Sequence, residues 1–243
     1  MPHHRGIGLS CVLEPAPVST VSPPLIVEPR GQARAAVIFL HGLGADGNDF
    51  ADFPARLGLS GVRYLFPHAP VRAVTLNAGA RMRAWFDIAR LGPGSGIDTA
   101  GLEESVATVD ALLRTVGERG VPVEKTILGG FSQGGAVALY AALTRGWPLA
   151  GVVALSTFLP AGLPRPSGAR PVPVFLAHGH RDPVVDVRLG MATRDALLRS
   201  GHEVRWWTHE DGHAVDGDEI RAIAAWMAER FGADDGEERR GTL

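Results

Sequence analysis

Residues 126–145 read TILGGFSQGGAVALYAALTR, and this stretch decides the fold. Its first six residues form a near-continuous apolar run, which is typical of a strand buried on both faces. From Ser132 to Arg145 the apolar residues predict a helix. A strand that enters a helix through a tight turn is a building unit of a parallel sheet covered by helices.

The turn contains G-F-S-Q-G, which fits the pattern G-x-S-x-G with Ser132 at its centre. Gly130 and Gly134 remove the Cβ atoms that would crowd a sharp strand-to-helix turn. The following helix begins at the serine, so free N–H groups favour negative charge there. We therefore predict Ser132 as a nucleophile and the N–H of Gln133 as an oxyanion donor. The alternative is a glycine-rich turn without catalysis.

A second loop that can serve an oxyanion lies in VIFLHGLGADGNDF (37–50), directly after an apolar run that ends at Leu40. It resembles the H-G-G-G loop of esterases, which makes the N–H of Leu43 the predicted second donor. We interpret His41 as a hydrogen-bonding brace, because it precedes the serine in the chain. A phosphate cradle is rejected, since the loop lacks the Lys-Ser/Thr of a P-loop and an acidic partner about 20 residues later.

Further apolar runs and amphipathic stretches alternate along the chain, which predicts a mostly parallel sheet with helices on both faces. Residues 25–232 form the predicted catalytic domain, after an irregular Pro-rich leader (1–24) and before a charged, frayed tail (233–243). The predicted strands are 35–40, 126–131, 149–156, 172–179 and 203–209, and the predicted helices are 103–118, 132–145, 187–200 and 218–231.

Composition narrows the function classes. The chain of 243 residues is 45% hydrophobic with a net charge of −2, which argues against a nucleic-acid binder. The single cysteine, Cys11, excludes an internal disulfide. Ser10–Cys11 is a poor lipoprotein site, because Gly8 stands where a Leu-like residue is expected. Without an apolar stretch of about 18 residues, we expect a soluble cytoplasmic protein.

A serine nucleophile needs a base, and the base needs an orienting carboxylate. VPVFLAHGHRDPVV (172–185) places Asp182 after a buried strand that follows the serine, where the acid is expected. Asp186 is the rival, but it stands where a helix should start and is better read as an N-cap. His178 and His180 are interpreted as loop structure without a ligand role.

The stretch HEDGH (209–213) has the letters of the zinc motif H-E-x-x-H. That motif requires both histidines on one helix face, whereas here a strand-like run precedes and Asp211-Gly212 indicates a turn. We instead predict His213 as the general base and no metal. His209 is the fallback base, and His202 lies at the wrong end of the strand.

These motifs together resemble the phospholipase/carboxylesterase family of α/β-hydrolases, which includes the acyl-protein thioesterases. The resemblance implies an α/β-hydrolase fold with no large cap domain, and no cofactor. It implies Ser132, Asp182 and His213 as a triad, with Leu43 and Gln133 as oxyanion-hole amides. The matching segments are HGLGADGNDF (41–50), FPHAP (66–70), WFD (85–87), GGFSQGG (129–135), AHGHRDPVV (177–185) and DGHAV (211–215).

The resemblance is weakest at residues 88–97, IARLGPGSGI, which are rich in Gly and Pro and should border the acyl groove. Trp85 is a candidate wall of that groove, with a place in the core as the alternative. We expect hydrolysis of short-to-medium acyl carboxylic esters, with acyl-protein thioesterase or lysophospholipase activity as alternatives. A non-catalytic binding module is the remaining alternative. The sequence leaves open the natural substrate, the acyl length and a homodimer formed through sheet edges.

Overall fold

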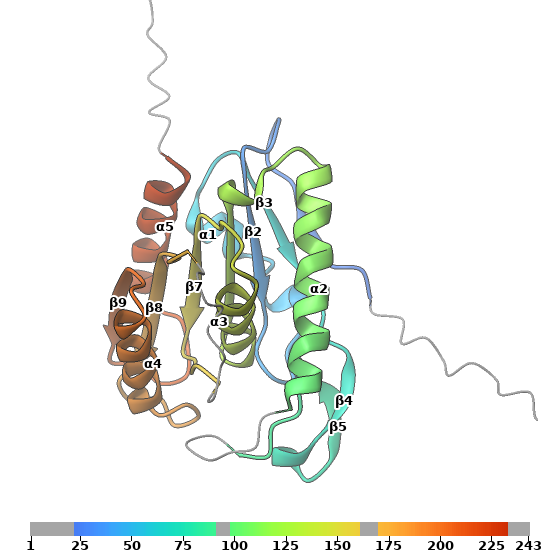
Figure 1. Ribbon diagram of the computed structural model, residues 1–243, viewed down its shortest axis with the longest axis vertical. Helices are drawn as coiled ribbons and strands as arrows, with labels where there is room; N and C mark the ends of the chain where they lie inside the picture. Colours follow the sequence, from blue (N-terminus) through green and yellow to red (C-terminus); the bar gives the residue numbers. More distant parts are fainter. Residues whose placement is uncertain (1–21, 91–97, 161–169, 233–243) are drawn as a thin grey trace, which may run out of the picture.

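The computed structural model describes residues 22–90, 98–160 and 170–232, and within them a central sheet of seven strands forms the scaffold (Figure 1). The strand order is β1-β3-β2-β6-β7-β8-β9. Strand β1 runs antiparallel to β3, and the other neighbours are parallel. The strands are β1 (Leu25–Val27), β2 (Ala35–Leu40), β3 (Val62–Phe66), β6 (Thr126–Phe131), β7 (Gly151–Leu155), β8 (Val174–Gly179) and β9 (Val204–His209).

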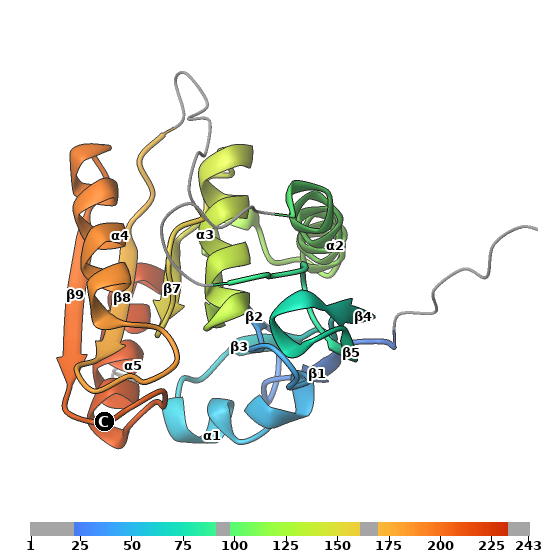
Figure 2. The same ribbon diagram turned by 90° about the horizontal axis from the view of Figure 1, so that it is seen from below.

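Helices cover both faces of the sheet (Figure 2). Helices α2 (Thr99–Glu118), α3 (Gln133–Arg145) and α4 (Val187–Arg199) pack on one face, around a core that includes Leu102, Val137 and Leu197. Helices α1 (Phe53–Leu57) and α5 (Gly217–Phe231) pack on the other face, around Phe53 and Trp226. The predicted doubly covered, mostly parallel sheet is confirmed, and no large cap domain interrupts the described part of the chain.

The central strands form where the apolar runs predict them. All six residues of β2 are buried, as are five of the six residues of β6. Such strands lose all contact with water on both faces, which explains why their sequences lack polar alternation. The predicted strands 149–156, 172–179 and 203–209 shorten to β7, β8 and β9.

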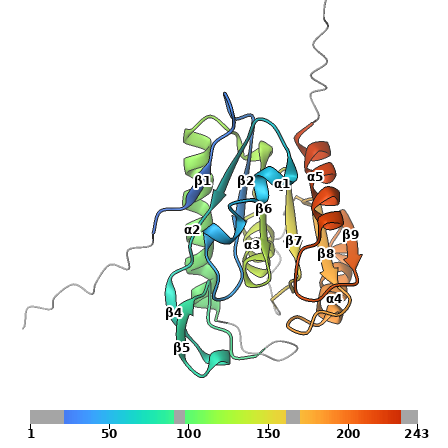
Figure 3. The same cartoon turned by 180° about the vertical axis from the view of Figure 1, so that it is seen from behind.

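A small hairpin stands apart from the main sheet (Figure 3). Its antiparallel strands are β4 (Val71–Val74) and β5 (Ala80–Arg83). The backbone N–H of Gly44 donates to the carbonyl of Arg83 at 2.8 Å, which joins the hairpin to the loop after β2. The short 3-10 helices are η1 (Gly47–Phe50), η2 (Thr75–Asn77) and η3 (Val123–Lys125).

Several predicted features fall outside the described residues. They include most of the leader (1–24), all of the tail (233–243) and residues 91–97 of the expected groove border. Among the helices that are described, none combines the length and the apolar character needed to cross a membrane.

Candidate active site

The turn between β6 and α3 holds Ser132 in a backbone conformation that side-chain-bearing residues rarely adopt, with φ 53° and ψ −119°. Such a conformation costs on the order of 1–3 kcal/mol and persists only where its surroundings enforce it. Here the Ser132 N–H donates to the Leu155 carbonyl at 2.8 Å, and its carbonyl accepts from Thr157 Oγ1 at 2.6 Å. The turn therefore projects the serine from the carboxyl end of β6 as the motif predicts.

The two glycines of the motif are required by close approach. A Cβ on Gly130 would collide with the backbone of Gly134, and a Cβ on Gly134 would collide with the carbonyl of Leu40. Residues with side chains at either position would push the helix away from the strands. The glycines thus let α3 start directly against β2 and β6.

The loop after β2 passes beside the nucleophile. A Cβ on Gly42 would lie 3.5 Å from Ser132 Cβ, so the loop backbone and the serine are neighbours. The N–H of Leu43 takes part in no backbone hydrogen bond within the described residues. Gln133 is the first residue of α3, and the first N–H groups of a helix have no intrahelical acceptor. Both amides are therefore available next to Ser132.

The Gln133 side chain and Trp85 brace this region. Gln133 Oε1 accepts from the Trp85 N–H at 2.9 Å, and its Nε2 donates to the Phe86 carbonyl at 2.8 Å. Trp85 Nε1 donates to the His41 carbonyl at 2.8 Å, and the Trp85 side chain is fully buried. The prediction of Trp85 as a groove wall is wrong, because a side chain with no exposed surface cannot line an open groove. Trp85 belongs to the core.

His41 acts as the predicted hydrogen-bonding brace. Its Nε2 accepts from the Ala69 N–H at 3.0 Å, so the proton sits on Nδ1, which donates to the Gly42 carbonyl at 2.7 Å. Burial is the main cause that lowers the pKa of His41. The neutral imidazole therefore holds the loop after β2 against the segment after β3.

Asp182 lies in the loop after β8, and its side chain is buried. Its Oδ1 accepts from the N–H groups of Val184 and Val185, each at 2.8 Å, which fixes the carboxylate. Its Oδ2 lies 2.7 Å from His213 Nδ1. Asp186 accepts instead from the Arg188 N–H and caps α4, which confirms its interpretation as an N-cap.

His213 lies between β9 and α5, in a bend rather than a helix. Because a carboxylate only accepts, the proton of the imidazole sits on Nδ1, and Nε2 carries the free lone pair. The imidazole packs against Phe131, the residue before Ser132, with ring centroids 4.6 Å apart. The structure thus places His213 against Asp182 and beside the residue that precedes Ser132, near the carboxyl ends of β6, β8 and β9.

His178, expected in a loop, is a fully buried residue of β8. Its Nε2 donates to the Val185 carbonyl at 2.7 Å and lies 3.5 Å from Asp182 Oδ2. Burial is the largest cause that lowers its pKa. His178 is therefore a neutral donor to the Val185 carbonyl that lies beside Asp182. Its position four residues before the aspartate, near the end of a strand, could have indicated that the two side chains are neighbours.

One group of described residues can bring together metal-ligand atoms, namely His209, Asp211 and Asp216. Their ligand-type atoms lie within 4.8 Å of one another. The group includes none of the three residues at the nucleophile, and Asp211 is exposed. Because β9 ends at His209, the two histidines of HEDGH do not share a helix face as a zinc protease motif requires.

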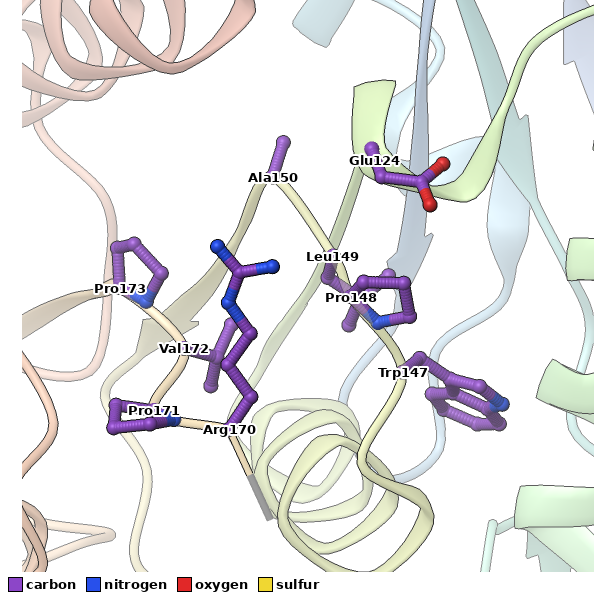
Figure 4. A pocket seen from close by; sticks show the side chains of 9 residues that line it. All are labelled: Glu124, Trp147, Pro148, Leu149, Ala150, Arg170, Pro171, Val172 and Pro173. Atoms are coloured by element: carbon purple, nitrogen blue, oxygen red, sulfur yellow. The ribbon is translucent and has the colours of Figure 1, made fainter.

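A pocket of about 280 Å³ lies elsewhere, at the amino ends of β7 and β8 (Figure 4). Residues 147–150 and 170–173 line it together with Glu124. Ser132 and Asp182 lie at the opposite, carboxyl ends of the strands, so this pocket is separate from the candidate active site.

The fold and this arrangement define a serine hydrolase with the α/β-hydrolase fold. The sequence model of the Phospholipase/Carboxylesterase family matches residues 22–230, and the chain belongs to that family. This confirms the family, the fold class and the ester-hydrolase class of enzyme that the sequence predicts.

Curated relatives and solved structures agree with this family. Acyl-protein thioesterase 1 of Neurospora crassa is 37% identical over 225 residues, covering 86% of this chain and 92% of the relative. Acyl-protein thioesterase 1 of Cryptococcus neoformans is 40% identical over 184 residues, covering 72% and 77%. The crystal structure of Zea mays acyl-protein thioesterase 2 matches with a TM-score of 0.79 and 32% identity, covering 86% and 99%. Arabidopsis thaliana SOBER1 matches with a TM-score of 0.75 and 31% identity, covering 82% and 99%.

Proposed function

We propose that Ser132, His213 and Asp182 are the catalytic triad of an enzyme that cleaves short-to-medium acyl carboxylic esters. The observation that carries the proposal is the 2.7 Å contact between His213 Nδ1 and Asp182 Oδ2, beside the turn that holds Ser132. This contact sets the imidazole tautomer that leaves Nε2 free to take a proton.

The reaction begins when His213 Nε2 takes the proton from Ser132 Oγ, and Oγ attacks the carbonyl carbon of the ester. The oxyanion of the tetrahedral intermediate accepts from the N–H groups of Leu43 and Gln133, each worth roughly 3–4 kcal/mol in such sites. The imidazolium then gives its proton to the departing alkoxide, and the acyl group stays on Ser132. His213 Nε2 then takes a proton from water as its oxygen attacks the acyl-enzyme carbonyl, and the imidazolium returns that proton to Ser132 Oγ as the bond to the acyl carbon breaks and the acid leaves.

Apolar side chains near the serine support an acyl substrate. Leu43 and Met82 are partly buried hydrophobic residues that pack against the core. Leu43 belongs to the loop beside Ser132, and the Met82 sulfur lies against Gly44 of the same loop. An acyl chain laid over them would remove further apolar surface from water, at about 0.8 kcal/mol per buried CH₂. This is the proposed start of the acyl groove.

A thioester substrate is the second candidate. The relatives from Neurospora crassa and Cryptococcus neoformans and the structure from Zea mays carry the name acyl-protein thioesterase. The same triad attacks an ester and a thioester carbonyl, so a small-molecule ester or thioester fits the site equally. Several features stay predictions from the sequence. They are a lysophospholipid substrate, a homodimer, a cytoplasmic location, and the absence of a cofactor and of nucleic-acid binding.

The test compares the wild type with Ser132→Ala on p-nitrophenyl acetate, butyrate and octanoate, and on a palmitoyl-thioester peptide. Turnover by the wild type alone supports Ser132 as nucleophile, and the chain-length profile separates an esterase from a thioesterase. Turnover by neither protein would favour the non-catalytic binding module. Equal turnover by both proteins would exclude Ser132 as the nucleophile.

A further inference from the structure

A buried pair of polar side chains, His209 and Glu219, plays no part in the mechanism above. His209 Nε2 lies 3.2 Å from Glu219 Oε2, and the two side chains are 5% and 1% exposed. Neither ring nitrogen and neither carboxylate oxygen has a hydrogen-bond partner of good geometry among the described residues. Burying such groups without a partner costs several kcal/mol, and their contact with each other offsets part of that cost.

The pair joins the two ends of the segment that carries His213. His209 is the last residue of β9, and Glu219 lies in the first turn of α5. The segment between these elements, residues 210–216, has no regular secondary structure. Its backbone is tied to the loop after β8 by the Arg181 N–H, which donates to the Asp211 carbonyl at a long 3.4 Å.

The start of α5 is built around the same glutamate. Asp216 Oδ1 accepts from the Glu219 N–H at 2.6 Å and forms the N-cap of the helix. The backbone of Glu219 thus fixes the end of the segment, while its side chain reaches back to the strand that begins it. Movement of His209 would shift the start of segment 210–216, and movement of α5 would shift its end.

We propose that Glu219 is a positioning residue that, through His209, fixes segment 210–216 and so holds His213 in place beside Ser132. The inference rests on the proposed function, because it assigns the triad base to His213. A catalytic group must be held within about 0.5 Å of its productive position, and a displacement of about 1 Å can cost 100-fold in rate. The contacts of His213 with Asp182 and Phe131 fix its ring, and the buried pair fixes its backbone.

The test uses Glu219→Leu, Glu219→Gln and the double variant His209→Leu/Glu219→Leu, assayed with p-nitrophenyl butyrate in the presence of EDTA. We expect Glu219→Leu to lower kcat at least about tenfold with KM nearly unchanged, because the imidazole is displaced while the groove is not. Glu219→Gln keeps a polar contact with His209 and should retain kcat within about twofold.

The double variant separates positioning from stability. Replacing both members of a buried pair with apolar residues is often neutral or stabilising, whereas removing one partner is destabilising. We therefore expect the double variant to regain the melting temperature lost in Glu219→Leu but to keep its low kcat. Wild-type kcat in Glu219→Leu, or recovery of kcat together with stability in the double variant, would overturn the proposal.

A matched control comes from the same two elements. Glu229 of α5 pairs with Arg205 of β9 at 3.3 Å, but both side chains are about half exposed, and Glu229 lies at the far end of α5 from segment 210–216. Glu229→Leu should leave kcat unchanged. Equal activity of the wild type and Ser132→Ala would contradict the proposed function. Loss of activity in Ser132→Ala together with wild-type kcat in Glu219→Leu would contradict only the positioning role of Glu219.

Discussion

Gln133 joins the nucleophile turn to residues 85 and 86 through two hydrogen bonds of one side-chain amide. Its Oε1 accepts from the Trp85 N–H, and its Nε2 donates to the Phe86 carbonyl. Two buried backbone groups that lie outside the helices and strands are satisfied in this way. The residue that supplies a proposed oxyanion amide therefore also anchors the loop beside it.

Gln133→Ala should lower the free energy of unfolding by about 2 kcal/mol or more, because each backbone group left unpaired costs roughly 1–3 kcal/mol. Urea unfolding followed by circular dichroism measures the change. Thr108→Ala is the control, since the Thr108 hydroxyl donates to the Glu104 carbonyl on an exposed helix face. This change should alter the free energy of unfolding by less than about 0.5 kcal/mol. Equal effects of the two changes would contradict this account of Gln133.

Gly134→Ala should lower the free energy of unfolding by about 2 kcal/mol or more and reduce turnover. The added Cβ meets the backbone of Leu40 and His41, which cannot move without shifting the loop beside Ser132. Gly117→Ala in α2 is the matched control. A Cβ there meets nothing within 4 Å, so it should stabilise the protein by about 0.5–1 kcal/mol. Thermal unfolding measures the stability of both variants. A Gly134→Ala variant as stable as the wild type would contradict the close approach of Gly134 to Leu40.

Asp182→Asn should lower kcat by about 10⁴ with KM little changed, because an amide at this position favours the wrong imidazole tautomer. Asp186→Asn should leave kcat unchanged, and at most weaken the cap of α4, since asparagine caps helices about as well as aspartate. Steady-state kinetics on p-nitrophenyl butyrate compares the two. A large loss of kcat in Asp186→Asn would reverse the assignment of the acid.

Glu219 should make stability depend on pH. Burial, followed by the Asp216 carboxylate, raises the pKa of Glu219 from 4.5 to about 8, and His209 lies 3.2 Å away. The folded protein therefore holds this proton more tightly than the unfolded chain. The resulting stability is full below about pH 4.5 and is lost as the pH rises through about 8.

Glu219→Gln has no such proton to lose, so its advantage in stability over the wild type should grow from pH 5 to pH 8.5. Urea unfolding at several pH values measures the difference between the two proteins. Parallel pH profiles would show that Glu219 does not titrate in this range.

Elements of the sheet differ in how clearly the sequence predicts them. Strands β2 and β6 have the predicted bounds, because strands buried on both faces leave an uninterrupted apolar run. Strand β1 has three residues, and β3 contains Arg63, so neither forms such a run. The β4–β5 hairpin is largely exposed and rich in arginine. The pairing of its two strands depends on contacts between residues that the hydrophobic periodicity of the sequence does not record.

Ser132 and the start of α3 follow from the sequence by itself, because a strand, a tight glycine-flanked turn and a helix are local features of adjacent residues. The sequence also predicts Asp182 and His213, because each follows a later strand of the parallel sheet. Only the tertiary structure decided that Trp85 is buried, that His178 lies 3.5 Å from Asp182, and that His209 meets Glu219. The physical reason is that the burial of a side chain and the partner it meets depend on how strands, helices and loops pack together, and spacing along the chain does not encode this.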